Sequence, residues 1–383
     1  MNRIFNKIFS YFYSSDSKNM VSIDTKTEIN ITTGLTLSPS LGNNREDRLW
    51  NTASQIQKIL DEMEEKKDEI TCLNLSTNSL SIEVAQAIAE KLKKMKNLNI
   101  AKFDDIFVSR LKTDSPVSLG HLVKAIEDKN IIELNLSDNA FGPIGAKSIE
   151  FYFRNTSTLK CLYLENNGLG PEGAELLANA LKGNKNIRLE RIRVGRNRLE
   201  NKGATAFGEF FKTATTLKEV VCFQNGIKDE GMSKLLEGLG NNKSLEVVKV
   251  NDNFIGDLST EVLLNILEGL SNLRVIDISD SNLGCENSIK VFQKLVLLGN
   301  LEEIYSNYND IEEKEAQLKI SEILQTVKSK LKKLELRGNE IKKSVFKKIK
   351  GNELLENADC YSESEMDADE LEELMGELNI NKK

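Results

Sequence analysis

The stretch LKCLYLENNGL, residues 159–169, decides the fold of this 383-residue chain. Its apolar positions and its asparagine, Asn167, follow the pattern L-x-x-L-x-L-x-x-N-x-L. A second clear copy, LKKLELRGNEI, occupies residues 331–341, and looser copies bring the total to ten. Self-similarity at a fixed period indicates stacked structural units rather than a single globular core.

The asparagine of the pattern recurs at a spacing close to 28 residues. Its positions are occupied by Asn78, Ile106, Asn139, Asn167, Asn197, Asn225, Asn253, Ser281, Asn309 and Asn339. This is the signature of a leucine-rich repeat, in which each unit contributes one strand and one returning segment. A unit of this length has room for a full α-helix in the returning segment. The sequence therefore predicts an α/β horseshoe solenoid of about ten repeats, with a parallel inner sheet and outer helices.

The repeat asparagine has an expected structural role. Its amide should bond the backbone groups of the turn that ends each strand, which would otherwise be buried without partners. The second repeat departs from the pattern, because Ile106 stands at the asparagine position and the repeat is five residues longer. Such an insertion maps to a loop on one rim of a solenoid. The loop reads FDDIFVSRLKTDSP, residues 103–116.

Composition divides the chain into three parts. Residues 1–45 are polar and predict an irregular leader, with a short membrane-contacting helix over residues 4–12 as the alternative. Residues 46–350 form the predicted solenoid, and a capping helix opens it. In that helix the apolar residues recur at helical spacing, namely Trp50, Ala53, Ile56, Leu60 and Met63.

The third part, residues 351–383, is an acidic tail. Residues 351–380 hold 11 Asp and Glu and no Lys or Arg. This charge exceeds in size the net charge of −7 of the whole chain, so the rest of the chain is close to neutral. A block of like charge is expected to be solvated, and the alternative is that it steers a basic partner.

The sequence argues against catalysis, metal binding and nucleic-acid binding by this chain. The five cysteines lack C-x-x-C pairing and the one histidine is His121, so neither a zinc site nor a histidine-assisted nucleophile is expected. Glycine loops with P-loop spacing are absent. A pI near 5.3 argues against nucleic acid, and no apolar run is long enough to predict a membrane span. We expect a binding protein with no cofactor or metal of its own.

The residue just before each repeat asparagine is expected to leave its strand and to point from the rim of the sheet. From the third repeat onward these residues are Asp138, Asn166, Arg196, Gln224, Asp252, Asp280, Tyr308 and Gly338. The row is polar and chemically varied. It would suit a protein-binding surface, and it would equally suit a solvated rim.

Several segments resemble the GTPase-activating proteins of the small GTPase Ran, a leucine-rich repeat family with a ribonuclease-inhibitor-like fold. They are residues 103–112 of the inserted loop, LSDNAFGP (136–143), YLENNGLGP (163–171), GRNRLE (195–200) and QNGI (224–227). The D-I-F-x-x-R loop and the GRNRLE turn are the specific part, because the repeat does not require them. The resemblance covers about residues 70–350, and the acidic tail also resembles that of the family.

The resemblance implies an activator of GTP hydrolysis by Ran in nucleocytoplasmic transport, without a catalytic site of its own. In the family an asparagine on the rim orients the catalytic glutamine of the GTPase, and no arginine finger is inserted. Asn166 matches that asparagine, and Arg110 matches the critical arginine of the inserted loop, which is implied to order the interface. Further candidates for contacts with the GTPase are Lys112, Asp138, Arg196 and Gln224.

The implied partner is a Ran-type small GTPase in its GTP form, which carries the GTP and the Mg²⁺ ion. A Ran-binding protein is a further candidate partner. We expect a monomer located in the cytoplasm, with the neighbourhood of the nuclear envelope as a candidate location. The alternative function is a ribonuclease-inhibitor-like scaffold that binds another protein through its concave face, where Tyr163, Arg193, Lys249 and Glu335 would matter more than the rim.

Overall fold

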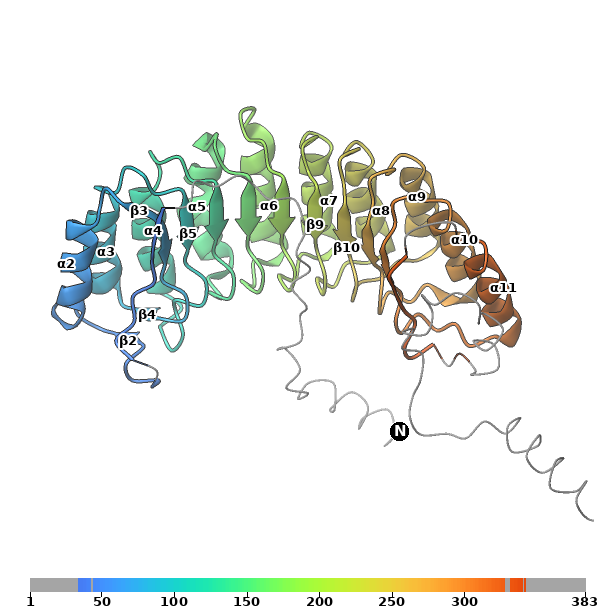
Figure 1. Cartoon of the computed structure of the whole chain (residues 1–383), viewed down its shortest axis with the longest axis horizontal. Coiled ribbons are helices and arrows are strands. Elements are labelled where there is room, and N and C mark those ends of the chain that lie inside the picture. The colour runs from blue at the N-terminus through green and yellow to red at the C-terminus, as the bar shows by residue number, and fades with distance from the viewer. Residues whose placement is uncertain (1–33, 43, 328–330, 340, 342–383) are drawn as a thin grey trace, which may run out of the picture. The chain divides into compact units, whose positions relative to one another are not determined.

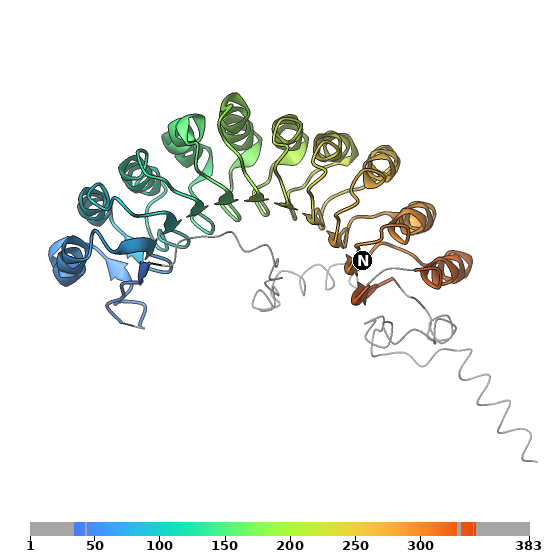
Figure 2. The ribbon, with the colours of Figure 1, turned by 45° about the horizontal axis from the view of Figure 1, so that its top comes forward.

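The computed structural model of the chain describes residues 34–42, 44–327, 331–339 and 341. These residues belong to one compact unit that begins at Gly34. Within this unit the strands line the inner side of a curve and the helices cover its outer side (Figures 1 and 2). The predicted parallel inner sheet and outer helices are confirmed.

The described part of the chain forms an 11-stranded parallel sheet in chain order. Its strands are β1 (Leu35–Leu37), β3 (Ile70–Asn74), β5 (Ile100–Lys102), β6 (Glu133–Asn135), β7 (Cys161–Tyr163), β8 (Arg191–Arg193), β9 (Glu219–Val221), β10 (Val247–Lys249), β11 (Val275–Asp277), β12 (Glu303–Tyr305) and β13 (Lys333–Glu335). The central residues of neighbouring strands pair with one another, as Leu134 does with Leu162 and Leu162 with Ile192. These apolar residues are buried toward the helices, so the flanking residues of each strand face the concave side.

One helix follows each strand of this sheet from β3 to β12, and one further helix, α2, precedes β3. The described helices are α2 (Gln57–Glu65), α3 (Ile82–Leu92), α4 (Ser115–Ala125), α5 (Gly142–Asn155), α6 (Gly170–Gly183), α7 (Glu200–Phe211), α8 (Asp229–Leu239), α9 (Asp257–Leu267), α10 (Gly284–Leu295) and α11 (Lys314–Leu324). Helices α7 and α8 approach so closely that a Cβ atom at Gly208 would lie 2.2 Å from the Lys234 carbonyl oxygen. Glycine is therefore required at this crossing.

The repeat asparagines form a ladder of hydrogen bonds through the turns. The Asn167 side-chain amide donates to the Leu164 carbonyl of its own repeat and to the Leu136 carbonyl of the preceding one, both at 2.9 Å. Its Oδ1 accepts from the backbone N–H of Asn139 at 3.0 Å. The predicted role of the asparagine is confirmed. Ile106 stands at the asparagine position of the second repeat, and its N–H donates to the Asn139 Oδ1 at 2.9 Å, as the N–H of Asn139 does to Asn167.

The prediction of an irregular leader through residue 45 is wrong for residues 35–37. These residues form β1, which pairs with β3 and covers an edge that would otherwise be open. The adjoining Pro39 carbonyl accepts a hydrogen bond of 3.1 Å from the Asn78 amide, so this segment takes the place of a preceding repeat. The predicted leader over residues 1–33 and the predicted acidic tail over 351–383 lie outside the described residues.

The predicted capping helix is shorter than its apolar pattern indicated. Trp50 lies in strand β2 (Leu49–Trp50), which pairs with β4 (Ser79–Leu80), and Ile56 ends a 3₁₀ turn over Ser54–Ile56. The α-helix begins only at Gln57. Trp50 is fully buried, and its indole Nε1 donates to the Asp47 carbonyl at 3.1 Å. A helical spacing of buried residues arises here from an extended segment followed by a 3₁₀ turn, which the pattern alone does not distinguish from a helix.

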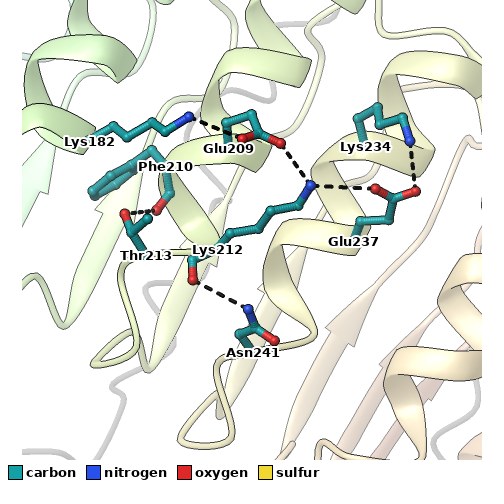
Figure 3. Close-up of polar contacts among 8 residues, drawn as sticks. All are labelled: Lys182, Glu209, Phe210, Lys212, Thr213, Lys234, Glu237 and Asn241. Atoms are coloured by element: carbon teal, nitrogen blue, oxygen red, sulfur yellow. Dashed lines mark hydrogen bonds and ion pairs between the residues drawn. The ribbon is translucent and has the colours of Figure 1, made fainter.

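The convex face of helices α6, α7 and α8 carries a connected set of ion pairs (Figure 3). Glu209 contacts Lys182 at 3.1 Å and Lys212 at 2.7 Å, while Glu237 contacts Lys212 at 3.6 Å and Lys234 at 2.9 Å. These side chains are between 36% and 52% exposed, so each pair is expected to contribute less than about 1 kcal/mol. Each of the two carboxylates in this set contacts two lysine ammonium groups.

Asp229, at the start of α8, caps the N-terminus of α9. Its Oδ1 accepts from the backbone N–H of Gly256 and of Ser259 at 3.0 and 2.9 Å, and its Oδ2 accepts from Leu258 at 3.1 Å. Burial opposes ionisation of this carboxyl. The hydrogen bonds from Ser259, Leu258 and Gly256 outweigh burial and hold the pKa of Asp229 below its ordinary value.

We expect Asp229→Ala to lower the free energy of unfolding by about 1–2 kcal/mol at pH 7, because the α9 terminus loses its cap. A carboxyl with a lowered folded-state pKa contributes stability above its unfolded pKa and loses it as the pH falls through the folded pKa. The difference between variant and wild type should therefore shrink below about pH 4. Urea unfolding of both proteins at pH 7 and pH 3 measures this, and an equal difference at both pH values would contradict it.

Candidate functional site

The residues that precede the repeat asparagines share an unusual backbone conformation. We call them the rim row: Thr77, Asp105, Asp138, Asn166, Arg196, Gln224, Asp252, Asp280, Tyr308 and Gly338. Their φ angles lie between 49° and 68°. This left-handed region turns the chain away from the sheet, so these side chains stand at the edge where the strands end. Most of them are exposed.

Asp138 and Asn166 are neighbours in the rim row and contact each other directly. The Asn166 Nδ2 donates to the Asp138 Oδ1 at 2.8 Å, and both side chains are exposed. They follow β6 and β7, which pair in the sheet. Asn167, one residue along, is fully buried in the asparagine ladder. Of these two adjacent asparagines, Asn167 therefore serves the ladder and Asn166 is exposed at the rim.

Arg196 and Gln224 continue the rim row after β8 and β9. The backbone N–H of Asn166 donates to the Gly195 carbonyl and that of Arg196 donates to the Phe223 carbonyl, both at 2.9 Å. Parallel strands lie roughly 4.8 Å apart, so the four residues from Asp138 to Gln224 span about 15 Å. The structure brings these four predicted residues together.

Arg196 occupies its left-handed conformation at a cost in stability. Its φ is 57°, a region that asparagine, aspartate and glycine tolerate better than long side chains do. We expect Arg196→Asn to raise the free energy of unfolding by roughly 0.5–1 kcal/mol. Denaturant unfolding measures the change. A loss of stability would show that the arginine side chain contributes more to the fold than its backbone strain costs.

Arg110 is held inside the N-terminal part of the solenoid. Its Nε donates to the Ser79 Oγ at 2.9 Å, and its Nη1 donates to the Asn51 Oδ1 at 2.7 Å. Its Nη2 donates to the carbonyl oxygens of Trp50 and Ser79 at 3.0 and 2.5 Å. The side chain is half-buried, and burial lowers the pKa of Arg110. These contacts, which we call the Arg110 clamp, join the inserted loop to β2 and β4.

The partners of Arg110 in the clamp are Ser79, Asn51 and Trp50, and none of them belongs to the rim row. Four of the five guanidinium N–H groups are used within the chain, so an arginine finger would have to leave the clamp and lose these four hydrogen bonds. The predicted role of Arg110, which is to order the interface with the GTPase, stays a prediction. Lys112, two residues further along the loop, is exposed.

Negative charge gathers at the ends of β5, β6 and β7. Burial is the main cause that raises the pKa of Asp104, Asp105 and Glu165 above its ordinary value, and the Asp138 carboxylate adds to the effect at each of them. Asp104 is also bonded by Ser76 at 2.7 Å. This edge therefore favours a partner surface that carries positive charge.

Exposed apolar side chains lie beside this edge, and the sequence interpretation missed them. Val108 and Leu111 of the inserted loop are 47% and 68% exposed, and Val117 and Ile144 in the first turns of α4 and α5 are 46% and 72% exposed. The sequence did contain a signal for an exposed apolar residue, because Ile144 lies outside the apolar helical stripe that Ile149 and the other buried residues of α5 form. Exposed apolar residues flanked by polar ones are typical of protein-binding surfaces.

The concave face, the alternative surface, has its charged side chains engaged with one another. Arg193 stacks over the Tyr163 ring at 5.3 Å and pairs with Glu219 at 2.5 Å. Glu219 is only 2% exposed. Lys249 lies 5.7 Å from the centre of the Tyr305 ring, and burial lowers its pKa. Binding through this face would have to break such contacts, whereas the rim residues already face outward.

Within the described ranges, no group of three or more His, Cys, Asp or Glu side chains is arranged to hold a metal ion. Burial raises the pKa of Cys161 and of Cys222 to about 12, so both thiols stay protonated at neutral pH. In the same part of the chain, none of the helices has the length and apolar character needed to cross a membrane.

The fold and its polar rim define a leucine-rich repeat protein that presents a binding edge. The family model described as Leucine Rich repeat matches residues 128–149 and 156–178. Among solved structures, the crystal structure of the Rad7 and Elc1 complex in yeast is similar, with a TM-score of 0.51 and 16% identity over 76% of this chain and 69% of that one. At this identity the likeness shows the fold alone.

Sequence relatives give the family. The chain is 30% identical over 309 residues to Ran GTPase-activating protein 1 of Saccharomyces cerevisiae. The matched region covers 76% of this chain and 75% of the yeast protein. It is 37% identical over 210 residues to the Ran GTPase-activating protein of Drosophila melanogaster, over 52% of this chain. The match spans only 35% of the length of the fly protein. The chain belongs to the family of Ran GTPase-activating proteins.

Proposed function

We propose that this protein stimulates GTP hydrolysis by a Ran-type small GTPase and thereby supports nucleocytoplasmic transport. The family supports this activity, and the geometry of the rim row supports a mechanism without an arginine finger. Many activators insert an arginine against the charge of the transition state. Here the arginine that the inserted loop supplies is held in the Arg110 clamp, whereas the Asn166 amide stands exposed at the edge.

The exposed amide of Asn166 is the observation that carries the proposal. In small GTPases a glutamine of the GTPase itself orients the attacking water. An amide that holds this glutamine in its productive geometry raises the rate, because orientation before reaction can account for several kcal/mol of a barrier. Asn166 needs no proton transfer and no charge for this task. Lys112, Asp138, Arg196 and Gln224 then contact the surface of the GTPase around it.

The proposed function assigns the nucleotide to the partner. The GTPase in its GTP form carries the GTP and the Mg²⁺ ion, and this chain acts as an activator with no catalytic site or cofactor of its own. The proposed form is a monomer in the cytoplasm, near the nuclear envelope. A Ran-binding protein is a proposed additional member of the complex.

Turnover of Ran·GTP with substoichiometric amounts of this protein tests the proposal. We expect each molecule of the chain to promote hydrolysis on many GTPase molecules, with a rate that rises in proportion to the amount added. A small GTPase of the Ras type serves as the specificity control. If Ran hydrolyses GTP at its intrinsic rate even with excess protein, the proposed function is wrong, and the concave-face scaffold becomes the better hypothesis.

A further inference from the structure

We infer that Asp138 is a positioning residue, whose carboxylate determines which end of the Asn166 amide faces the GTPase. This inference rests on the proposed function and extends it. An asparagine side chain has a donor end and an acceptor end, and rotation about its last bond exchanges them. An exposed asparagine without a neighbour would present either end. The contact with Asp138 removes that ambiguity.

The polarity of the pair follows from chemistry. An ionised carboxylate only accepts hydrogen bonds, so the atom of Asn166 that lies 2.8 Å from the Asp138 Oδ1 is the amide nitrogen. The amide oxygen then points away from Asp138. Because one partner is charged, this hydrogen bond is stronger than a bond between two neutral groups. Asn166 therefore presents an acceptor to whatever docks on the rim.

The backbone on both sides of the pair is fixed. Asp138 and Asn166 have φ angles of 61° and 55°, and their N–H groups donate to the Glu165 and Gly195 carbonyls at 2.9 Å. The ladder between Asn139 and Asn167 holds the residues that follow them. Only side-chain torsions remain to be set, and the carboxylate sets those of Asn166.

An outward-facing acceptor is the polarity that the reaction requires. A glutamine that orients the attacking water uses its carbonyl oxygen toward that water, which leaves its NH₂ group to be held. The Asn166 oxygen can accept a hydrogen bond from that NH₂ group. If the Asn166 amide were turned round, two donors would face each other and the glutamine would be misplaced.

Two substitutions at Asp138 separate this role from others. Asp138→Gly removes the acceptor, and Asp138→Asn keeps an acceptor oxygen while removing the charge. Both new residues tolerate the left-handed backbone at this position. Asp310→Gly is the matched control, because Asp310 is an exposed aspartate outside the rim row, with a φ of 56°. All variants are assayed in the full chain by single-turnover hydrolysis of Ran·GTP across protein concentrations.

We expect Asp138→Gly to lower the maximal stimulated rate of hydrolysis by about 10-fold or more. The activator concentration that gives half of the maximal rate should change less. Asp138→Asn should stay within about threefold of wild type, because the acceptor is retained. Asp310→Gly should match wild type. In an Asn166→Ala background, Asp138→Gly should cause no further loss, because the group that it positions is absent.

A readout without the GTPase follows the Asn166 side-chain NH₂ signals by NMR. We expect hydrogen-bonded amide protons in wild type and in Asp138→Asn, and solvent-like protons in Asp138→Gly. Wild-type stimulation by Asp138→Gly would overturn the inference while leaving the proposed function standing. Equal losses in Asp138→Gly and Asp138→Asn would also overturn the inference, because they would show that Asp138 acts through its charge on the GTPase and not as the acceptor that orients Asn166. A wild-type protein that fails to stimulate Ran would overturn the proposed function and this role with it.

Discussion

Asn166→Ala should lower the maximal rate of stimulated GTP hydrolysis by about 100-fold or more while changing the affinity for Ran·GTP only a few-fold. The amide is exposed, and its hydrogen bond within the chain is to Asp138, so its removal leaves the fold intact. An interaction that aligns the glutamine for reaction contributes mainly in the transition state, and its loss therefore falls on the maximal rate.

The measurement is single-turnover hydrolysis across a range of activator concentrations. Alanine at a φ of 55° introduces some backbone strain, so Asn166→Gly is the companion variant that removes the amide without it. Both variants should lose the same amount of activity and keep the unfolding transition of wild type. A loss of affinity with an unchanged maximal rate would assign Asn166 to docking rather than to positioning.

Arg110→Ala should also abolish most of the stimulation, through the structure of the N-terminal repeats. The variant removes the four hydrogen bonds of the clamp and leaves the Trp50 and Ser79 carbonyls without this donor. We expect a loss of about 2–3 kcal/mol in local stability, since hydrogen bonds to a charged group are the stronger ones. Hydrogen exchange should accelerate in residues 49–51 and in the inserted loop.

Asn51→Ala is the variant that distinguishes a structural role of Arg110 from a direct role at the nucleotide. The Asn51 Oδ1 accepts from the Arg110 Nη1 at 2.7 Å, so this variant weakens the clamp while the arginine stays in place. If Arg110 acts through the clamp, Asn51→Ala should reproduce part of the lost stimulation and part of the faster exchange. If Arg110 instead reaches the nucleotide as a finger, Asn51→Ala should leave stimulation unchanged or raise it, because the arginine is released.

The solenoid could be predicted from the sequence because an asparagine makes the same backbone hydrogen bonds in most of the repeats. Asn167 bonds the carbonyls of two repeats, so any replacement leaves buried backbone groups unpaired, and the period stays visible in the sequence. The rim row follows from the same register, since each of its residues precedes such an asparagine. The contact between Asp138 and Asn166 could therefore have been predicted from the sequence, because residues at the same position of consecutive repeats lie side by side.

Other features depend on contacts that no local pattern encodes. Strand β1 has only three residues and lacks the repeat signature, so pairing with β3 alone defines it. Trp50 is buried in a strand, although its spacing to Ile56 suits a helix. The clamp joins Arg110 to Asn51 and Trp50, which lie about 60 residues earlier in the chain. A motif indicates that this arginine matters, but only the packed structure shows what it holds.

A structure of the complex with Ran bound to a non-hydrolysable GTP analogue is the most direct test of the central claim. The expected result places the Asn166 Oδ1 within about 3 Å of the amide nitrogen of the catalytic glutamine, with its NH₂ group still on Asp138 and Arg110 still in its clamp. A complex in which Asn166 lies far from the nucleotide, or in which Arg110 has left the clamp to contact the phosphates, would contradict the claim.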